Sequence, residues 1–147
     1  MGSTLNVCEI FRSIQGEGTR AGMPCTFVRL AGCNLRCSWC DTRYAYDSGR
    51  PMPVDDVLTA VADLGCRRVE VTGGEPLVQP ASWDLMHRLC KAGCETLLET
   101  NRHLEEAVSR VCAAAARSGG QGGNRRVCRA PDSRAGRDVS EWIANAR

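Results

Sequence analysis

Residues 26–42 read TFVRLAGCNLRCSWCDT and carry the strongest structural signal in the chain. The β-branched and aromatic residues of Thr26–Leu30 predict a short strand. This strand runs directly into Cys33, Cys37 and Cys40, which have the spacing C-x3-C-x2-C. Three thiolates on one tight loop can ligate three irons of a cubane iron–sulfur cluster. The stretch therefore predicts a strand that ends in a metal-binding loop.

The three cysteines leave the fourth iron of such a cluster without a protein ligand. The amino and carboxylate groups of S-adenosylmethionine can chelate an open iron of this kind. A structural zinc site would need a fourth ligand. The residues that could supply it lack paired spacing to the first three: Cys25, Cys66, His87, Cys90, Cys94 and His103. We favour the cluster and keep zinc as the alternative.

Hydrophobic periodicity outside this loop predicts alternating strands and helices. Strands are expected at 7–14, 26–30, 69–72 and 96–100, and helices at about 53–65 and 83–93. Strand–helix–strand–helix–strand order at this spacing indicates parallel pairing with right-handed crossovers. The sequence therefore predicts an α/β fold whose functional loops lie at the carboxyl ends of the strands.

A second chemical signal, VTGGEP, occupies residues 71–76, directly after a predicted strand. Two glycines allow a ligand to approach the backbone closely, and Pro76 fixes the exit of the turn. The free N–H and C=O groups of such a turn could bind the two ends of a small zwitterion. The motif is weak alone, but its combination with the cysteine loop is specific.

Composition narrows the possible partners and location. The 147 residues are 43% hydrophobic, which fits one globular unit, and the net charge is only +2. This charge predicts no nucleic-acid partner and no anionic membrane surface. No signal peptide and no membrane-spanning stretch is recognised, so we expect a cytoplasmic protein. In a reducing compartment, ten cysteines indicate metal or redox chemistry rather than disulfides.

The character of the chain changes near Leu104. All eleven leucines lie at or before this position, and 26 of the 43 residues from 105 to 147 are Ala, Arg, Gly or Ser. We predict a core over residues 1–104, and a tail over 105–147 that begins as a helix and continues as loop or disorder. A reading-frame shift in a GC-rich gene would produce such a tail, and an unusual natural truncation would look similar.

Several stretches together resemble one family, the 7-carboxy-7-deazaguanine synthases of the radical S-adenosylmethionine (SAM) superfamily. They are EIFRSIQGEG at 9–18, GMP at 22–24, FVRLAGCNLRCSWCDT at 27–42, TGGEP at 72–76 and LETN at 98–101. The resemblance implies a partial (β/α) barrel of the radical SAM type. It also implies a lyase that converts 6-carboxytetrahydropterin to 7-carboxy-7-deazaguanine with loss of ammonia, in queuosine biosynthesis.

The resemblance also implies roles for individual residues. Cys33, Cys37 and Cys40 would ligate a 4Fe-4S cluster, and Thr42 would help bind Mg²⁺. The residues that would contact SAM are Trp39, Cys40, Asp41 and Gly74. The residues that would bind the pterin substrate are Ile14, Gln15, Gly16, Arg29 and Thr72, with Arg29 on its carboxylate. The family further implies an electron donor such as flavodoxin and a homodimer.

The chain departs from this family after LETN. The family has glycine next, whereas this chain has Arg102 and His103. The later strands and the family's Asp-x-Lys element are not recognised, so we expect a barrel truncated after about the fourth or fifth strand. Two other hypotheses remain open: an activase that abstracts hydrogen from a glycine of a partner enzyme, and a non-catalytic metal-binding fragment.

Overall fold

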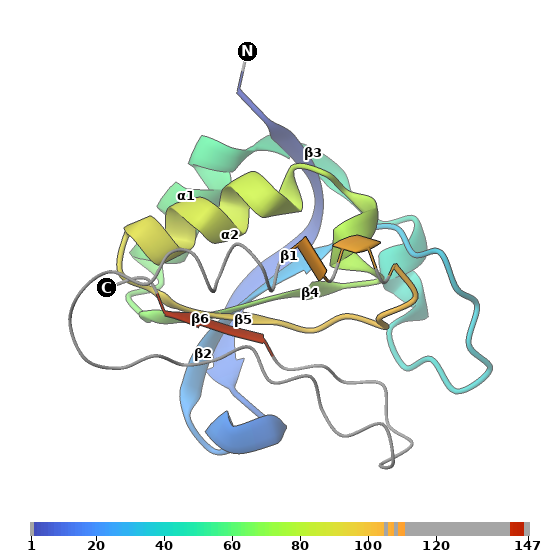
Figure 1. The fold of residues 1–147 in the computed structure, drawn as a ribbon, viewed down its shortest axis with the longest axis horizontal. Helices are drawn as coiled ribbons and strands as arrows, with labels where there is room; N and C mark the ends of the chain where they lie inside the picture. The colour runs from blue at the N-terminus through green and yellow to red at the C-terminus, as the bar shows by residue number, and fades with distance from the viewer. Residues whose placement is uncertain (1, 105, 108, 111–141, 146–147) are drawn as a thin grey trace.

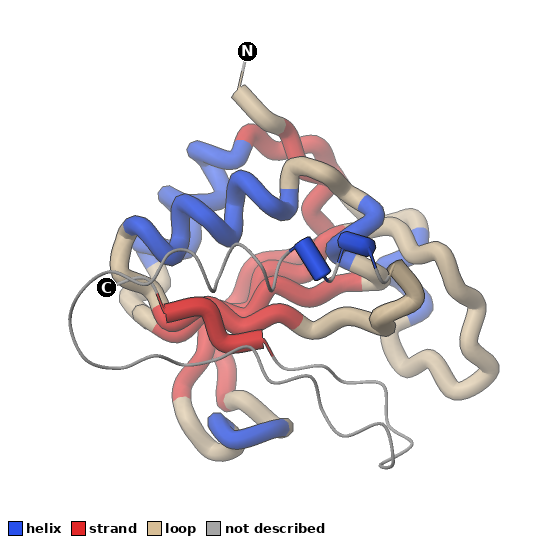
Figure 2. The backbone as a smooth tube through the Cα atoms, in the orientation of Figure 1, coloured by secondary structure: helices blue, strands red, loops and turns tan. Residues whose placement is uncertain are grey.

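The protein folds as one mixed sheet with its helices packed on one face (Figures 1 and 2). The computed structural model describes residues 2–104, 106–107, 109–110 and 142–145. The strands are β1 (Thr4–Ile14), β2 (Pro24–Leu30), β3 (Arg50–Pro53), β4 (Arg68–Gly73), β5 (Glu95–Leu98) and β6 (Trp142–Asn145). The α-helices are α1 (Val54–Asp63) and α2 (Ser82–Lys91), and the 3-10 helices are η1 (Gly18–Arg20), η2 (Arg43–Tyr46) and η3 (Pro76–Val78).

Three parallel strands form the centre of the sheet, whose order is β3-β1-β2-β4-β5-β6. Strand β4 pairs in parallel with β2 on one side and with β5 on the other, and the chain passes through α1 and α2 between them. This arrangement confirms the predicted α/β alternation. The carboxyl ends of β2, β4 and β5 therefore meet at one edge of the molecule.

Helix ends follow the glycines of the sequence. Gly65 and Gly93, two residues beyond the ends of α1 and α2, have φ angles of 63° and 76°. Glycine adopts this left-handed region without the steric penalty that a Cβ brings. Both helices can therefore stop and turn the chain back toward the next strand.

The antiparallel side of the sheet was not anticipated. Strand β1 pairs antiparallel with β2, and β3 pairs antiparallel with β1. Strand β3 contains Pro51 and Pro53, which cannot donate backbone hydrogen bonds. Proline is confined to edge strands for this reason, and it hid the strand from propensity arguments.

The core lies between the sheet and the two helices. Its buried side chains form one continuous cluster that includes Val28 and Leu30 from β2, Val57 from α1 and Leu85 and Leu89 from α2. Burial of each such side chain contributes about 1.5–3 kcal/mol. Because successive side chains of a strand point to opposite faces, the residues between these core positions of β2 and β4 point to the other face of the sheet. On that face Phe11 stacks on Phe27, with ring centroids 5.2 Å apart.

Strand β6 lies in the segment for which we expected loop or disorder. Its residues pair antiparallel with Glu95–Leu98 of β5. The four described residues between 105 and 110 are helical. Most of the predicted tail, residues 111–141 and 146–147, lies outside the described residues.

In the described part of the chain, no helix is long and apolar enough to cross a membrane.

Candidate functional site

Loops from three parallel strands meet at one edge of the sheet and contact one another. The longest follows β2 and carries the cysteines, where Figure 2 shows an extended loop beside η2. The amide of Gly74, after β4, donates to the Leu30 carbonyl at 3.1 Å, and that of Glu75 donates to the Gly32 carbonyl at 2.8 Å. The VTGGEP turn is thus hydrogen-bonded to the start of the cysteine loop.

Close packing at Gly74 explains the glycine there. A Cβ at this position would lie 2.2 Å from the Gly32 carbonyl oxygen and 2.9 Å from the Cβ of Cys33. No side chain fits at such distances, so the turn can rest against Cys33 only with glycine. Gly74 therefore lies directly beside the first cysteine of the loop.

The buried carboxylate of Glu75 connects the turn to the loop after β5. Its side chain is fully buried and accepts hydrogen bonds from the Leu77 amide at 2.9 Å, the Asn101 amide at 2.7 Å and the Thr100 hydroxyl at 2.9 Å. Burial raises the pKa of Glu75, although these hydrogen bonds oppose the change. Asn101 also donates its side-chain amide to Asn34 of the cysteine loop at 2.9 Å.

Glu75 was missed as an individual residue by the sequence analysis, although the turn was recognised. A glutamate between glycine and proline is polar and gives no periodicity signal. Only the tertiary structure places Thr100 and Asn101 around it.

The three motif cysteines are free, partly exposed thiols on the loop. The Leu35 amide donates to Cys33 Sγ at 3.5 Å, a contact that stabilises a thiolate. Trp39 between them is 81% exposed. Among the described residues, however, no three His, Cys, Asp or Glu side chains converge as a ready-made metal site.

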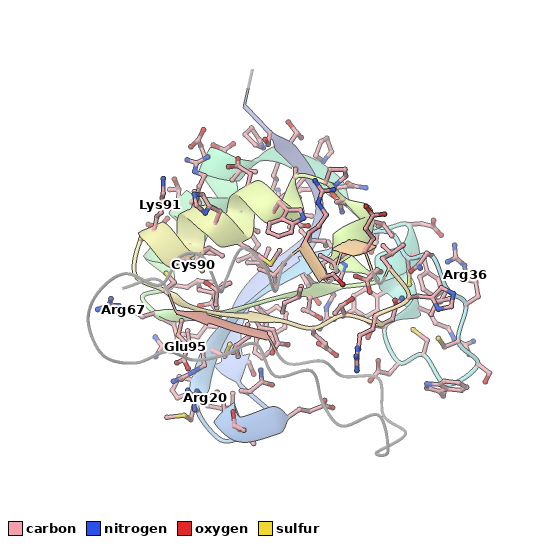
Figure 3. All side chains as sticks on the ribbon, viewed as in Figure 1. Arg20, Arg36, Arg67, Cys90, Lys91 and Glu95 are labelled. Atoms are coloured by element: carbon pink, nitrogen blue, oxygen red, sulfur yellow. The ribbon has the colours of Figure 1, made fainter. Side chains whose placement is uncertain are left out.

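Tyr46 was not anticipated at this loop. Its hydroxyl forms a hydrogen bond with Cys40, which raises the pKa of Tyr46, and the nearby Cys33 acts in the same direction. The Arg36 guanidinium lies 4.2 Å from the centre of the Tyr46 ring, and Figure 3 shows Arg36 at the outer end of the loop. Tyr46 therefore bridges the two sides of the cysteine loop.

A pocket of about 300 Å³ opens beside the cysteine loop on the face of the sheet opposite the helices. Five of its residues were predicted from the sequence: Gln15, Gly16, Arg29, Asp41 and Thr42. The others were not: Glu17, Gly18, Phe27, Glu70, Leu98 and Glu99. Four carboxylate side chains and one arginine thus line it, with apolar surface from Phe27.

Gln15 is held rigidly in this pocket. It is buried, its side-chain amide donates to the Glu70 carboxylate, and its side-chain oxygen accepts from the Glu17 amide at 3.2 Å.

Burial, and to a smaller extent the negative charge of Glu70, raises the pKa of Cys25 to about 12. Cys25 is consequently a neutral thiol at neutral pH and part of the packing.

The remaining predicted residues lie around the pocket in different ways. Thr72 is buried and donates its hydroxyl to Glu99 at 2.7 Å, so it contacts the pocket wall. Thr42 donates to Asp41 at 2.6 Å. Ile14 is 57% exposed and does not line the pocket, although the next two residues, Gln15 and Gly16, do.

Sequence and structure comparisons place the chain among known proteins. A sequence model described as the radical SAM superfamily matches residues 27–132. The chain therefore belongs to the radical SAM superfamily.

Individual relatives carry a more particular name. The chain is 49% identical over 100 residues to a 7-carboxy-7-deazaguanine synthase of Chlorobaculum tepidum, an alignment covering 68% of this chain and 46% of the relative. It is 38% identical over 130 residues to one of Koribacter versatilis, covering 84% and 58%. The crystal structure of QueE from Escherichia coli is similar, with a TM-score of 0.60 and 29% identity over 67% of this chain and 52% of that chain.

The chain spans about half the length of the curated relatives it matches. The superfamily match over residues 27–132 includes the cysteine loop and the VTGGEP turn.

Proposed function

We propose that this chain forms the cluster-binding and substrate-binding part of a radical SAM lyase of the 7-carboxy-7-deazaguanine synthase type. The observation that carries the proposal is the polar pocket directly beside the cysteine loop, which is lined by Arg29, Gln15 and the carboxylates of Glu70 and Glu99. The six-stranded sheet would be the first part of a (β/α) barrel. The named relatives support the same reaction.

Cys33, Cys37 and Cys40 would hold the 4Fe-4S cluster, because free thiols on one loop are the usual ligands of such clusters. Ligation by the three thiolates would couple metal binding to local folding of this loop. When bound, the cluster supplies one electron to the sulfonium of SAM. Gly74 and Asp41 would contact SAM from two sides of the loop, together with Trp39 and Cys40.

The pocket chemistry matches a carboxylated pterin. Arg29 provides a planar guanidinium for the carboxylate. The carboxylates of Glu70 and Glu99 would accept hydrogen bonds from the N–H-rich pyrimidine edge, and the Gln15 side-chain amide would add a fixed polar group. Phe27 would provide apolar surface for the ring. Thr72 would fix Glu99 through its hydroxyl. Thr42, held by Asp41, would contribute an oxygen to Mg²⁺.

The overall conversion needs no external oxidant. 6-Carboxytetrahydropterin would rearrange to 7-carboxy-7-deazaguanine and release one ammonia, which balances all atoms. An electron-donor protein such as flavodoxin would reduce the cluster, and the assembly would be a homodimer. A pocket of about 300 Å³ fits a bicyclic substrate better than the glycine loop of a partner enzyme, which favours the lyase over an activase.

Anaerobic reconstitution of the full chain with iron and sulfide tests the cluster. We expect about four irons and four sulfides per chain, and protection of Cys33, Cys37 and Cys40 from alkylation by iodoacetamide. Cys37→Ala should lose both effects, whereas Cys66→Ala should retain them, because Cys66 lies outside the loop. Stoichiometric zinc in place of iron would contradict the proposal.

Addition of SAM to the reduced, reconstituted protein tests the open iron. We expect a changed electron paramagnetic resonance spectrum, because SAM chelates the iron that has no cysteine ligand. An unchanged spectrum in a fully reconstituted sample would contradict SAM binding at this site.

A further inference from the structure

Arg29 does not act alone in the structure, because a glutamate outside the pocket binds it. Glu9 on β1 and Arg29 on β2 are direct partners in the antiparallel ladder. The Glu9 carboxylate accepts a hydrogen bond from Arg29 Nε at 2.8 Å. Glu9 itself does not line the pocket, whereas Arg29 does.

The atom that Glu9 binds determines what Arg29 can offer. A guanidinium has one donor at Nε and four on its two terminal nitrogens. No other acceptor among the described residues meets Arg29, and its side chain is 17% exposed. Binding at Nε fixes the plane of the group and leaves the terminal nitrogens available for a bidentate contact with a ligand carboxylate.

Tyr44 adds a second restraint to Glu9. This residue lies in η2, which follows the cysteine loop, and its hydroxyl donates to the same Glu9 oxygen at 2.7 Å. Burial raises the pKa of Glu9, but the hydrogen bonds from Tyr44 and Arg29 outweigh it, so the net pKa lies below the ordinary value. Glu9 is therefore ionised at neutral pH and can hold Arg29 by charge as well as by geometry.

We propose that Glu9, held by Tyr44, is a positioning residue that presents Arg29 to the carboxylate of the substrate. This inference rests on the proposed function. It assigns carboxylate selectivity to a Tyr44–Glu9–Arg29 chain that also links the substrate pocket to the end of the cysteine loop.

Two fluorescent ligands test the proposal with the full, reconstituted chain. Pterin-6-carboxylate carries the group that Arg29 would bind, and pterin lacks it. We expect the wild-type protein to prefer the carboxylated ligand, as measured by fluorescence anisotropy. Glu9→Ala should weaken binding of pterin-6-carboxylate about tenfold and leave pterin binding nearly unchanged, because a loosely held guanidinium loses its bidentate geometry.

A gentler variant and a matched control accompany this experiment. Tyr44→Phe removes only the hydroxyl and should reduce the preference by about threefold. Asp56→Ala removes an exposed carboxylate on α1 that does not line the pocket and should retain the full preference. Urea unfolding of each variant shows that it is folded, so Tyr44→Phe provides the test if Glu9→Ala does not fold.

The outcomes separate this inference from the proposed function. An unchanged preference in folded Glu9→Ala or Tyr44→Phe overturns the positioning role and leaves the proposed function intact. The positioning role is likewise overturned if Arg29→Lys loses the preference while Glu9→Ala and Tyr44→Phe both retain it. A wild-type protein without any preference for the carboxylate overturns both.

Discussion

Arg102 has a backbone conformation that suits a different residue. Its φ angle is 60°, the only positive value of a non-glycine residue in the described part of the chain. This is the position where the resembling family has glycine. The left-handed conformation costs an L-residue about 1–2 kcal/mol, because Cβ approaches the following carbonyl oxygen. The loop after β5 therefore has a backbone conformation at Arg102 that suits glycine better than arginine.

Replacement of this arginine should stabilise the protein. Arg102→Gly removes the steric cost but adds about 0.5–1 kcal/mol of entropy in the unfolded chain, so the net gain should be about 0.5–1 kcal/mol. Urea unfolding at neutral pH measures it. Arg102→Ala retains a Cβ and serves as the control, with no gain expected; an equal gain in both variants would mean that the backbone is not strained.

The elements around the site depend on Glu75 because the turn after β4 and the loop after β5 share its carboxylate. The turn after β4 contributes Leu77, and the loop after β5 contributes Thr100 and Asn101. Buried donors that lose their acceptor cost about 1–3 kcal/mol each. The Glu75 carboxylate thus holds the turn after β4 and the loop after β5 together beside Cys33.

Removal of this carboxylate should therefore be costly. Glu75→Ala should lower the free energy of unfolding by about 3–5 kcal/mol, since three donors are left without an acceptor. Thr100→Val removes only one hydroxyl and should cost about 1 kcal/mol. Urea unfolding gives both values, and hydrogen exchange at the Asn101 amide should accelerate only in the first variant. Equal costs would show that Glu75 is not the common acceptor.

At the scale of the whole molecule, the cysteine loop and a stabilising ion-pair network lie at opposite ends of the parallel strands. Figure 3 shows Arg36 of the cysteine loop at one end and Arg20, Arg67 and Glu95 at the other. At this second end the Glu95 carboxylate binds Arg20 at 2.5 Å and Arg68 at 2.8 Å, and all three side chains are largely buried. The amino ends of the parallel strands thus hold an ion-pair network at the end of the sheet opposite the cysteine loop.

Glu95→Gln should reveal this separation. We expect a loss of about 2 kcal/mol in unfolding free energy, because two partly buried arginines lose their counter-charge. The electron paramagnetic resonance spectrum of the reconstituted cluster, with and without SAM, should not change. Asp55→Asn, in an exposed pair with Arg88, should cost less than about 1 kcal/mol and calibrates the measurement. A changed spectrum in Glu95→Gln would contradict the separation.

Local patterns in the sequence predicted the central elements. Cysteine spacing, glycine positions and the alternation of apolar runs are properties of neighbouring residues, and they identified β2, α1, β4, α2 and β5 together with the cysteine loop and VTGGEP turn. The resemblance to a family added five residues that the structure does bring to one pocket: Gln15, Gly16, Arg29, Asp41 and Thr42.

Tertiary structure alone decided the remaining contacts. Glu9 meets Arg29 only because β1 reverses against β2, and Glu75 meets Asn101 only because β4 and β5 end at the same edge. Glu70 reaches Gln15 across 55 positions of sequence. Polar residues such as these give no periodic signal, and their partners depend on strand order and register. The sequence therefore determined which elements form and which loop carries the thiols, while packing of distant strands determined which charges face one another.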